Sequence, residues 1–374
     1  MPKNKKRPCI QETDFTAGTV SHLSRVKGST GNEELDRRIA ELVHDFGCAR
    51  RSDLIEEMVI TALKIGSDDL GTGDLKLMNR SLREMREANN VFNPYRTTRK
   101  ISIFGSARTP PDKPEYLAAE LFGRRIAEEG FMTITGAGEG IMGAAQKGGG
   151  RENGFGLNIR LPFEQGANET IDGDPKLVNF NYFFTRKLSF VKESEAIALF
   201  PGGFGTMDEG FEVLTLIQTG KARIIPIVMV DAPGGSYWRT WLQFIREHLF
   251  RLGLISESDF SLFKVFDDVE AAVAEVVGFY RVFHSYRYVG QKFVIRLNDR
   301  ITDAAVAILN ADFPDVIKEG AIRLSKPLKA ERNEPELANL PRLVFTAHQR
   351  NYGRLRELID AINRSETEPS TAGA

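Results

Sequence analysis

Apolar residues between positions 30 and 92 recur three or four residues apart, which is the spacing of amphipathic helices. One stripe starts at Ile39, a second at Leu54 and, after three glycines, a third at Leu75. The pair Asn93-Pro94 ends this pattern. We therefore predict a helical amino-terminal segment, residues 1–95, with a disordered basic start and no evident chemistry of its own.

A different pattern begins at Lys100, where short apolar runs alternate with helical ones. This alternation is typical of βαβ units around a parallel sheet. The predicted strands are 101–104, 131–135, 155–161, 177–182, 196–200 and 227–230. The helix after 196–200 is expected to bury one apolar face, made of Met207, Phe211, Leu214 and Ile217. The fold class is thus α/β, with a Rossmann-like doubly wound parallel sheet as the core, residues 96–282.

The pattern changes again beyond Phe283. Strands are predicted at 293–295, 321–324 and 343–345, and helices at 301–309 and 352–362. We assign residues 283–364 to a small α+β accessory unit. The remaining residues, 365–374, are small and polar and are predicted to be a disordered tail.

Composition narrows the classes of partner. The 50 Lys and Arg residues balance 51 Asp and Glu, so the overall charge does not favour a nucleic-acid partner. Cys9 and Cys48 cannot build a disulfide framework, and the five histidines lack metal-ligand spacing, so no metal site is predicted. The sequence contains no apolar run long enough to span a membrane. We expect a cytoplasmic protein with neither a membrane nor a nucleic acid as partner.

Ligands of open α/β sheets bind beyond the carboxyl ends of the strands, so the loops that follow strands are the candidates for chemistry. The first such loop is Gly105-Ser106-Ala107-Arg108. Its small residues allow a ligand to approach the backbone closely, and Arg108 supplies a cation for a phosphate or a base. A purely structural Gly-Ser turn is the alternative interpretation.

The second loop contains Gly136, Gly138 and Gly140 and could present backbone amides to a phosphate. Its spacing also fits a dinucleotide fingerprint. However, it follows the second strand of the sheet, and Asn158 and Arg160 stand where that fingerprint needs a ribose-binding carboxylate. A nicotinamide cofactor is therefore disfavoured.

The third loop, Pro201-Gly202-Gly203-Phe204-Gly205-Thr206-Met207-Asp208-Glu209, lies between a predicted buried strand and an amphipathic helix. Its glycines and the start of the helix can together form an anion site that suits a phosphate. Residues 206–209 also satisfy the S/T-x-x-E capping box, so Glu209 has a structural interpretation beside a catalytic one. Asp208 is interpreted as an acid in the first helical turn.

Upstream, Thr185-Arg186-Lys187 opens another predicted helix. Cations at the start of a helix oppose its dipole, so their placement suggests an anionic ligand nearby. A solvated basic turn is the alternative.

In this order the motifs GSAR, GAGEGIMGA, TRK and PGGFGTMDE resemble the Lonely Guy (LOG) family of phosphoribohydrolases, related to nucleotide 5′-monophosphate nucleosidases and often labelled lysine decarboxylases. The resemblance covers about residues 100–279. Asp208 stands where the family commonly has Glu. The flanking segments are absent from the short cytokinin-activating members, so hormone specificity is not carried over.

The resemblance implies hydrolysis of the N-glycosidic bond of nucleoside 5′-monophosphates, without a cofactor, by a homodimer or larger homo-oligomer. It assigns catalysis to Arg186 and Glu209 and electrostatic support to Lys187. Substrate binding is assigned to Gly105, Ser106, Arg108, Gly136, Gly138, Gly140, Lys187, Gly202, Gly203, Gly205 and Thr206.

Two other classes of function stay open at this point. One is a non-catalytic carrier of a nucleotide or of the molybdenum cofactor, which would need the phosphate loop but no carboxylate at the glycosidic carbon. The other is a regulatory or assembly protein. Amino-acid decarboxylation is disfavoured, because the sequence carries no independent signature of pyridoxal binding.

Overall fold

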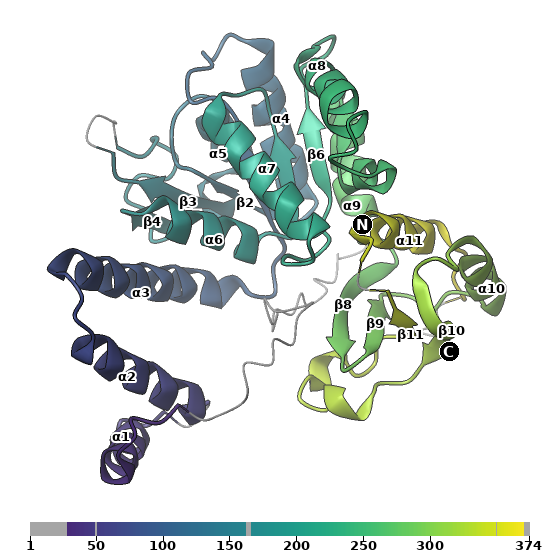
Figure 1. Ribbon diagram of the computed structural model, residues 1–374. Helices are drawn as coiled ribbons and strands as arrows, with labels where there is room; N and C mark the ends of the chain where they lie inside the picture. Colours follow the sequence, from purple (N-terminus) through teal and green to yellow (C-terminus); the bar gives the residue numbers. More distant parts are fainter. Residues whose placement is uncertain (1–27, 49–50, 162–165, 349, 370–374) are drawn as a thin grey trace. The chain divides into compact units, whose positions relative to one another are not determined.

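The computed structural model describes residues 28–48, 51–161, 166–348 and 350–369 (Figure 1). The predicted basic start and the last five residues of the predicted tail lie outside these residues. The described chain divides into two compact units, one that ends at Glu87 and one that starts at Ala88. None of the described helices is both long and apolar enough to cross a membrane.

The amino-terminal unit is helical, as its apolar spacing predicts. Ile39 and Val43 of the first helix pack with Ile60 of the second in a small apolar core. Asn32 caps the first helix, because its side chain accepts a hydrogen bond from the Leu35 N–H at 3.1 Å. The helices are α1 (Glu33–Asp45), α2 (Ser52–Ser67) and α3 (Thr72–Phe92), the last of which continues into the second unit.

A seven-stranded parallel sheet forms the core of the second unit, which confirms the predicted fold class. Its strands lie in the order β4-β3-β2-β1-β5-β6-β7. Most of them are buried on both faces, which explains their nearly continuous apolar sequences. They are β1 (Lys100–Phe104), β2 (Met132–Thr135), β3 (Gly154–Ile159), β4 (Leu177–Phe180), β5 (Ala196–Leu199), β6 (Ile227–Val230) and β7 (Lys264–Phe266).

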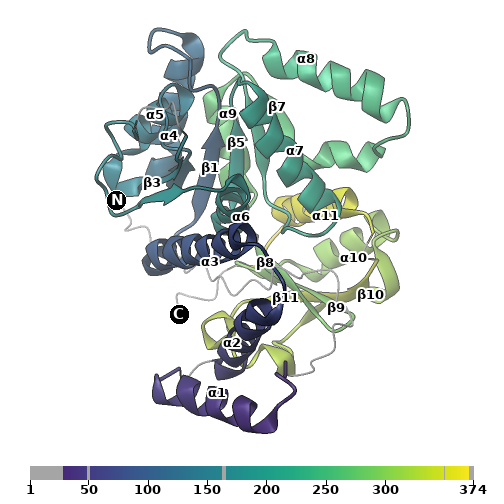
Figure 2. The ribbon, with the colours of Figure 1, turned by 60° about the vertical axis from the view of Figure 1, so that its left-hand side comes forward.

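Helices cover both faces of this sheet. From β1 to β4 each new strand is added on one side of the sheet, and β5 to β7 are then added on the other side of β1. Because the connections between parallel strands are right-handed, α4 and α5 lie on one face and α6 and α7 on the other (Figures 1 and 2). A π-helical turn, Ile245–Phe250, continues α8. The helices are α4 (Pro114–Glu128), α5 (Ile141–Gly149), α6 (Phe183–Glu193), α7 (Phe204–Gln218), α8 (Tyr237–Phe244) and α9 (Val269–Gly278).

β1 and β5 are parallel neighbours in the sheet, and later strands are added on opposite sides of this pair: β2 to β4 beyond β1, and β6 and β7 beyond β5. Such a switch point opens a crevice at the carboxyl ends of the strands. The loops that begin at Gly105 and Pro201 follow these two strands, and the loop that begins at Gly136 follows β2 on the other side of β1. The fold therefore brings the three glycine-rich loops to one edge of the sheet.

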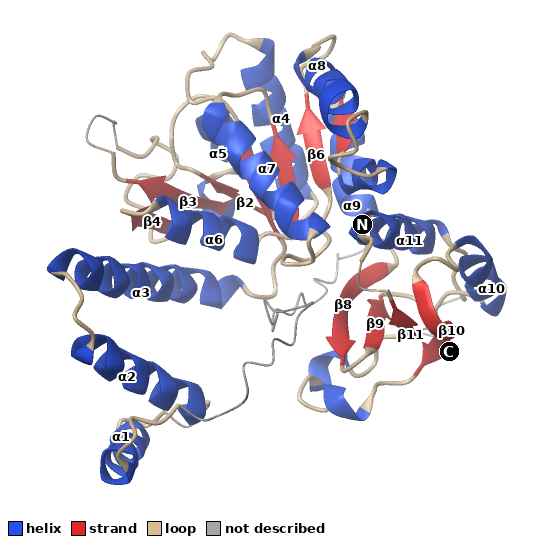
Figure 3. Ribbon diagram, viewed as in Figure 1, coloured by secondary structure: helices blue, strands red, loops and turns tan. Residues whose placement is uncertain are grey.

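A second, antiparallel sheet lies in the carboxy-terminal part, with strand order β10-β11-β9-β8 (Figure 3). The buried Glu331, in a 3-10 helix between two of these strands, accepts hydrogen bonds from Arg296 and Arg342 on the sheet. The elements are β8 (Phe283–Val289), β9 (Lys292–Leu297), α10 (Asp303–Asp312), β10 (Ile317–Ser325), β11 (Arg342–Ala347) and α11 (Tyr352–Arg364). Short 3-10 helices span Asn93–Tyr95, Arg151–Asn153, Glu257–Leu262, Lys329–Glu331 and Pro335–Leu337.

The predicted tail begins too early. The Thr302 N–H donates to the carbonyl of Glu366 at 3.1 Å, and the Glu368 N–H donates to that of Arg300 at 2.8 Å. Thr367 forms a β-bridge with Ile301. The prediction of disorder is therefore wrong for these residues, because backbone hydrogen bonds fix a segment that has little apolar surface of its own.

Candidate functional site

The three glycine-rich loops contact one another through their backbones. The Ser106 N–H donates to the carbonyl of Pro201 at 3.1 Å. The Ser106 carbonyl in turn accepts from the Ile141 N–H, at the start of α5, at 3.0 Å. The loop after β1 thus connects the loops after β5 and β2, and the residues predicted from separate motifs come together.

Close approach requires glycine at two positions of this junction. A Cβ at Gly202 would lie 2.1 Å from Thr206 Oγ1 and 3.0 Å from Ser106 N. A Cβ at Gly140, which also has a φ of +64°, would lie 2.3 Å from the Ser106 carbonyl oxygen. These glycines allow the loops to pack, whatever they contribute to a ligand.

The loop after β2 is held in a strained conformation. Ala137 has a φ of 62°, which is unusual for a residue with a side chain. The buried Asn168 donates from Nδ2 to the carbonyls of Ala137 and Gly138, both at 3.0 Å. A Cβ at Gly136 would lie 3.8 Å from Arg186 Nη1, so this loop also borders α6. No motif in the sequence indicates the role of Asn168.

The loop after β5 leads into an open helix start. Helix α7 begins at Phe204, and Gly203 at its N-cap provides no side-chain cap. The first N–H groups of a helix have no partner within the helix, so they can bind an anion. A Cβ added at Gly203 or Gly205 would meet no atom within 4 Å, and Phe204 is 96% exposed. This turn is accessible to a ligand.

The capping-box interpretation of residues 206–209 is wrong. Since α7 already starts at Phe204, Thr206 lies inside its first turn and Glu209 lies in the second. Asp208 is likewise beyond the first turn, and its carboxylate pairs with Lys187 Nζ at 2.8 Å. Glu209 is therefore not explained by capping.

Glu209 points into the protein on the buried face of α7. It is 5% exposed, and its Oε2 atom has no hydrogen-bond partner among the described residues. Burial raises the pKa of Glu209 to about 7, although the nearby cations Lys187 and Arg186 act in the opposite direction. A carboxyl group in this state can take up or release a proton near neutral pH.

The cations come from α6, which packs beside the start of α7. Lys187 Nζ lies between two carboxylates of α7, 2.8 Å from Asp208 and 3.0 Å from Glu212. The Arg186 guanidinium lies over the ring of Phe183, 5.0 Å from its centroid. Both cations act on Glu209 electrostatically, so the structure places the predicted pair Arg186 and Glu209 in one locality.

Arg108 and Tyr237 also contact the glycine-rich loops. Arg108 has an exposed side chain, and its N–H donates to Ser106 Oγ at 3.1 Å. Tyr237, at the start of α8, donates its hydroxyl to the carbonyl of Gly202. Sequence reasoning missed Tyr237, because it lies outside every glycine-rich motif.

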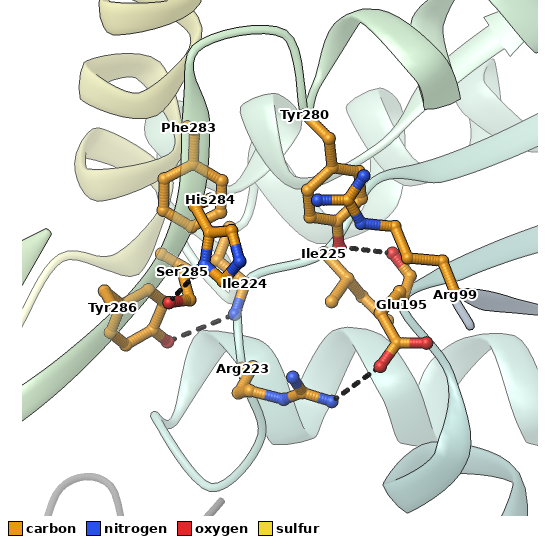
Figure 4. A pocket seen from close by; sticks show the side chains of 10 residues that line it. All are labelled: Arg99, Glu195, Arg223, Ile224, Ile225, Tyr280, Phe283, His284, Ser285 and Tyr286. Carbon is orange, nitrogen blue, oxygen red and sulfur yellow. Dashed lines mark hydrogen bonds and ion pairs between the residues drawn. The ribbon is translucent and has the colours of Figure 1, made fainter. Parts of the chain in front are cut away.

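A separate pocket lies at the opposite, amino-terminal edge of the sheet, where the core meets β8 (Figure 4). Arg223 pairs there with Glu195 at 3.6 Å, and the Arg99 guanidinium lies 4.0 Å from the ring centroid of Tyr280. The residues that line this pocket include none of the predicted site residues.

Two solved structures similar to this chain are molybdenum-cofactor proteins. The molybdenum cofactor binding protein of Rippkaea orientalis is 18% identical, with 47% of this chain and 93% of that chain covered and a TM-score of 0.34. The molybdenum cofactor carrier protein of Chlamydomonas reinhardtii is 21% identical, with 47% and 94% covered and a TM-score of 0.31. Scores this low carry no argument about function.

Sequence relatives are more informative. Residues 139–276 match a family model described as possible lysine decarboxylase. Two rice proteins (Oryza sativa subsp. japonica) described as probable cytokinin riboside 5′-monophosphate phosphoribohydrolases also match. LOGL5 is 32% identical over 153 residues, which cover 39% of this chain and 59% of LOGL5. LOG4 is 31% identical over 128 residues, which cover 33% of this chain and 54% of LOG4. The matches thus span little more than half of either relative. Over this central region, the predicted resemblance to the LOG phosphoribohydrolases is confirmed.

Proposed function

We propose that this protein hydrolyses the N-glycosidic bond of nucleoside 5′-monophosphates, releasing a free base and ribose 5-phosphate. The observation that carries the proposal is the buried Glu209 carboxyl, which lies near two cations and within two helical turns of the open start of α7. The relatives, described as phosphoribohydrolases, support the same class of reaction.

Glu209 is the proposed catalytic carboxylate. Cleavage of the bond between C1′ and the base leaves positive charge on the ribosyl group, and a negative group near C1′ stabilises that charge. Water supplies the new oxygen on C1′, and one of its protons goes to Glu209 while the base leaves with the bonding electron pair. A carboxyl group with a pKa near neutral can then pass that proton to the departing base, which gives the free base and restores the carboxylate.

The remaining residues bind and orient the substrate. The N–H groups at the start of α7, together with Gly202, Gly203, Gly205 and Thr206, are proposed to bind the 5′-phosphate. Holding the phosphate fixes the distance from the ribose to Glu209. Arg186 is proposed to hold the substrate and to favour departure of the base, with Lys187 as electrostatic support. No step requires a cofactor.

The test is incubation of the full chain with a panel of nucleoside monophosphates, nucleosides and triphosphates, followed by chromatography for free base. We expect monophosphates to be cleaved with a much higher kcat/KM than nucleosides, because only they can use phosphate binding to orient the ribose. The Glu209→Gln variant is the control and should lose turnover by roughly a hundredfold or more.

Two outcomes would contradict the proposal. Equal kcat/KM for AMP and adenosine would remove the role of the phosphate loop. Tight binding of nucleotides without release of any base would favour the carrier function instead.

We also propose that the protein acts as a homodimer or larger homo-oligomer, which the resemblance implies. Light scattering on the purified protein measures its mass, and a monomer at assay concentrations that is fully active would contradict this proposal.

A further inference from the structure

The hydroxyl group of Tyr237 donates a hydrogen bond to the carbonyl of Gly202, inside the proposed phosphate loop. From this contact we infer that Tyr237 is a positioning residue, which orients the peptide between Gly202 and Gly203 for phosphate binding. The inference rests on the proposed function, and it adds a residue that lies about thirty positions beyond the glycine-rich motif.

The geometry of a trans peptide connects this contact to the ligand. The described residues contain no cis peptide bond, and in a trans peptide the C=O and N–H groups point in opposite directions. Fixing the carbonyl of Gly202 toward Tyr237 therefore turns the N–H of Gly203 away from Tyr237. Gly203 is the N-cap of α7, so its N–H precedes the first N–H groups of that helix, which have no partner within the helix.

Packing on the other side of the loop restricts its movement. The α-carbon of Gly202 faces Thr206 Oγ1 and Ser106 N so closely that even a methyl group would not fit. The loop is thus held between these atoms and the Tyr237 hydroxyl. Without the hydroxyl, the Gly202–Gly203 peptide can rotate, because glycine restricts its neighbouring dihedral angles least.

Tyr237 is itself well anchored. The N–H of the next residue, Trp238, donates to the carboxylate of the buried Asp231 at 3.0 Å. The rings of Tyr237 and Trp238 also pack edge to face, with centroids 4.9 Å apart. Asp231 directly follows β6, so the sheet fixes the start of α8 and hence the position of the hydroxyl.

The experiment compares Tyr237→Phe with the parent. Binding of ribose 5-phosphate is measured by calorimetry, and kcat and KM are measured with a cleaved monophosphate and its nucleoside. We expect roughly five- to tenfold weaker binding of ribose 5-phosphate and a similar rise in KM for the monophosphate, as for one lost hydrogen bond. The kcat/KM for the nucleoside should stay within about twofold, because it has no phosphate to orient.

Tyr286→Phe is the matched control. Tyr286 also hydrogen-bonds a backbone group, the N–H of Ile224 at 3.1 Å, but at the opposite edge of the sheet (Figure 4). This variant should bind ribose 5-phosphate like the parent, even where thermal melts show that both variants lose some stability.

Each outcome bears on the inference. Parental affinity and KM in Tyr237→Phe would overturn it and leave the proposed hydrolysis intact. Equal losses for the monophosphate and the nucleoside would also overturn it, since they indicate a general structural role. A parent that binds no ribose 5-phosphate would overturn it too. A parent that binds ribose 5-phosphate but cleaves nothing, with weaker binding in Tyr237→Phe, would support it while refuting the proposed hydrolysis.

Discussion

Replacing Glu209 by Gln should reveal the cost of burying this carboxyl group. Its pKa rises from 4.5 to about 7 because α7 turns it into the protein, where Oε2 has no hydrogen-bond partner among the described residues. Gln keeps the shape of the side chain and cannot ionise. The substitution thus separates the effect of the charge from the effect of packing.

The sign and size of the effect follow from the two pKa values. Below pH 4.5 the carboxyl group is protonated in both the folded and the unfolded chain. Between 4.5 and about 7, only the unfolded chain releases the proton, so the free energy of unfolding falls as the pH rises. At about 1.4 kcal/mol for each pH unit, the parent loses about 3 kcal/mol over this window, and Glu209→Gln does not.

The assay is urea unfolding of the parent and the variant at several pH values from about 4 to about 8. The stability of Glu209→Gln relative to the parent should increase with pH by about 3 kcal/mol and level off above pH 7. The exposed Glu139→Gln is the control for loss of a carboxylate as such and should change stability by less than about 0.5 kcal/mol. A stability difference for Glu209→Gln that stays constant with pH would refute the reasoning.

Three further perturbations test other parts of the argument. Lys187→Met removes a cation that lowers the pKa of Glu209, so the rise of kcat/KM with pH should move to higher pH, as measured by a pH–rate profile. Gly202→Ala should lower thermal stability and abolish binding of ribose 5-phosphate, because its Cβ would overlap a neighbouring side chain, whereas Gly203→Ala should melt like the parent. Glu331→Ala removes a carboxylate that two buried arginines share, although Arg296 still pairs with Glu334, and should lower the free energy of unfolding by about 3 kcal/mol, as measured in urea.

The sheet could be predicted from the sequence because its buried strands are short apolar runs. Two strands, one in each sheet, were not predicted. β7 has only three residues and lies at the edge of the sheet, and β8 alternates aromatic with polar residues around His284 and Arg287. Both strands depend on pairing with a neighbouring strand, so their local hydrophobic pattern predicts them only weakly.

Periodicity predicted the buried face of α7 only in part. Of the predicted face, Ile217 is buried, and Met207 and Leu214 pack against the core. Phe211, however, is 40% exposed, while Glu209 and Gly210 are buried. The small Gly210 allows the helix to approach Leu199 of β5, since a Cβ there would lie 3.0 Å from Leu199 Cδ1. That approach turns Glu209 inward. A carboxylate on a buried face contradicts the hydrophobic pattern, and such local conflicts are expected where function, and not stability, selects the residue.

Some site residues could be found from the sequence and others could not, because backbone geometry restricts the identity of only the first group. Glycines after strands are visible because only a few residue types permit such backbone geometry. Asn168 and Tyr237 instead bind backbone carbonyls of those loops, a contact that any well-placed Asn or Tyr can make. The sequence therefore does not reveal that these two residues belong to the site, and only their position in the fold shows it. Since both fix loops that the glycines leave free to move, the residues hidden from the motif supply the rigidity that the motif itself lacks.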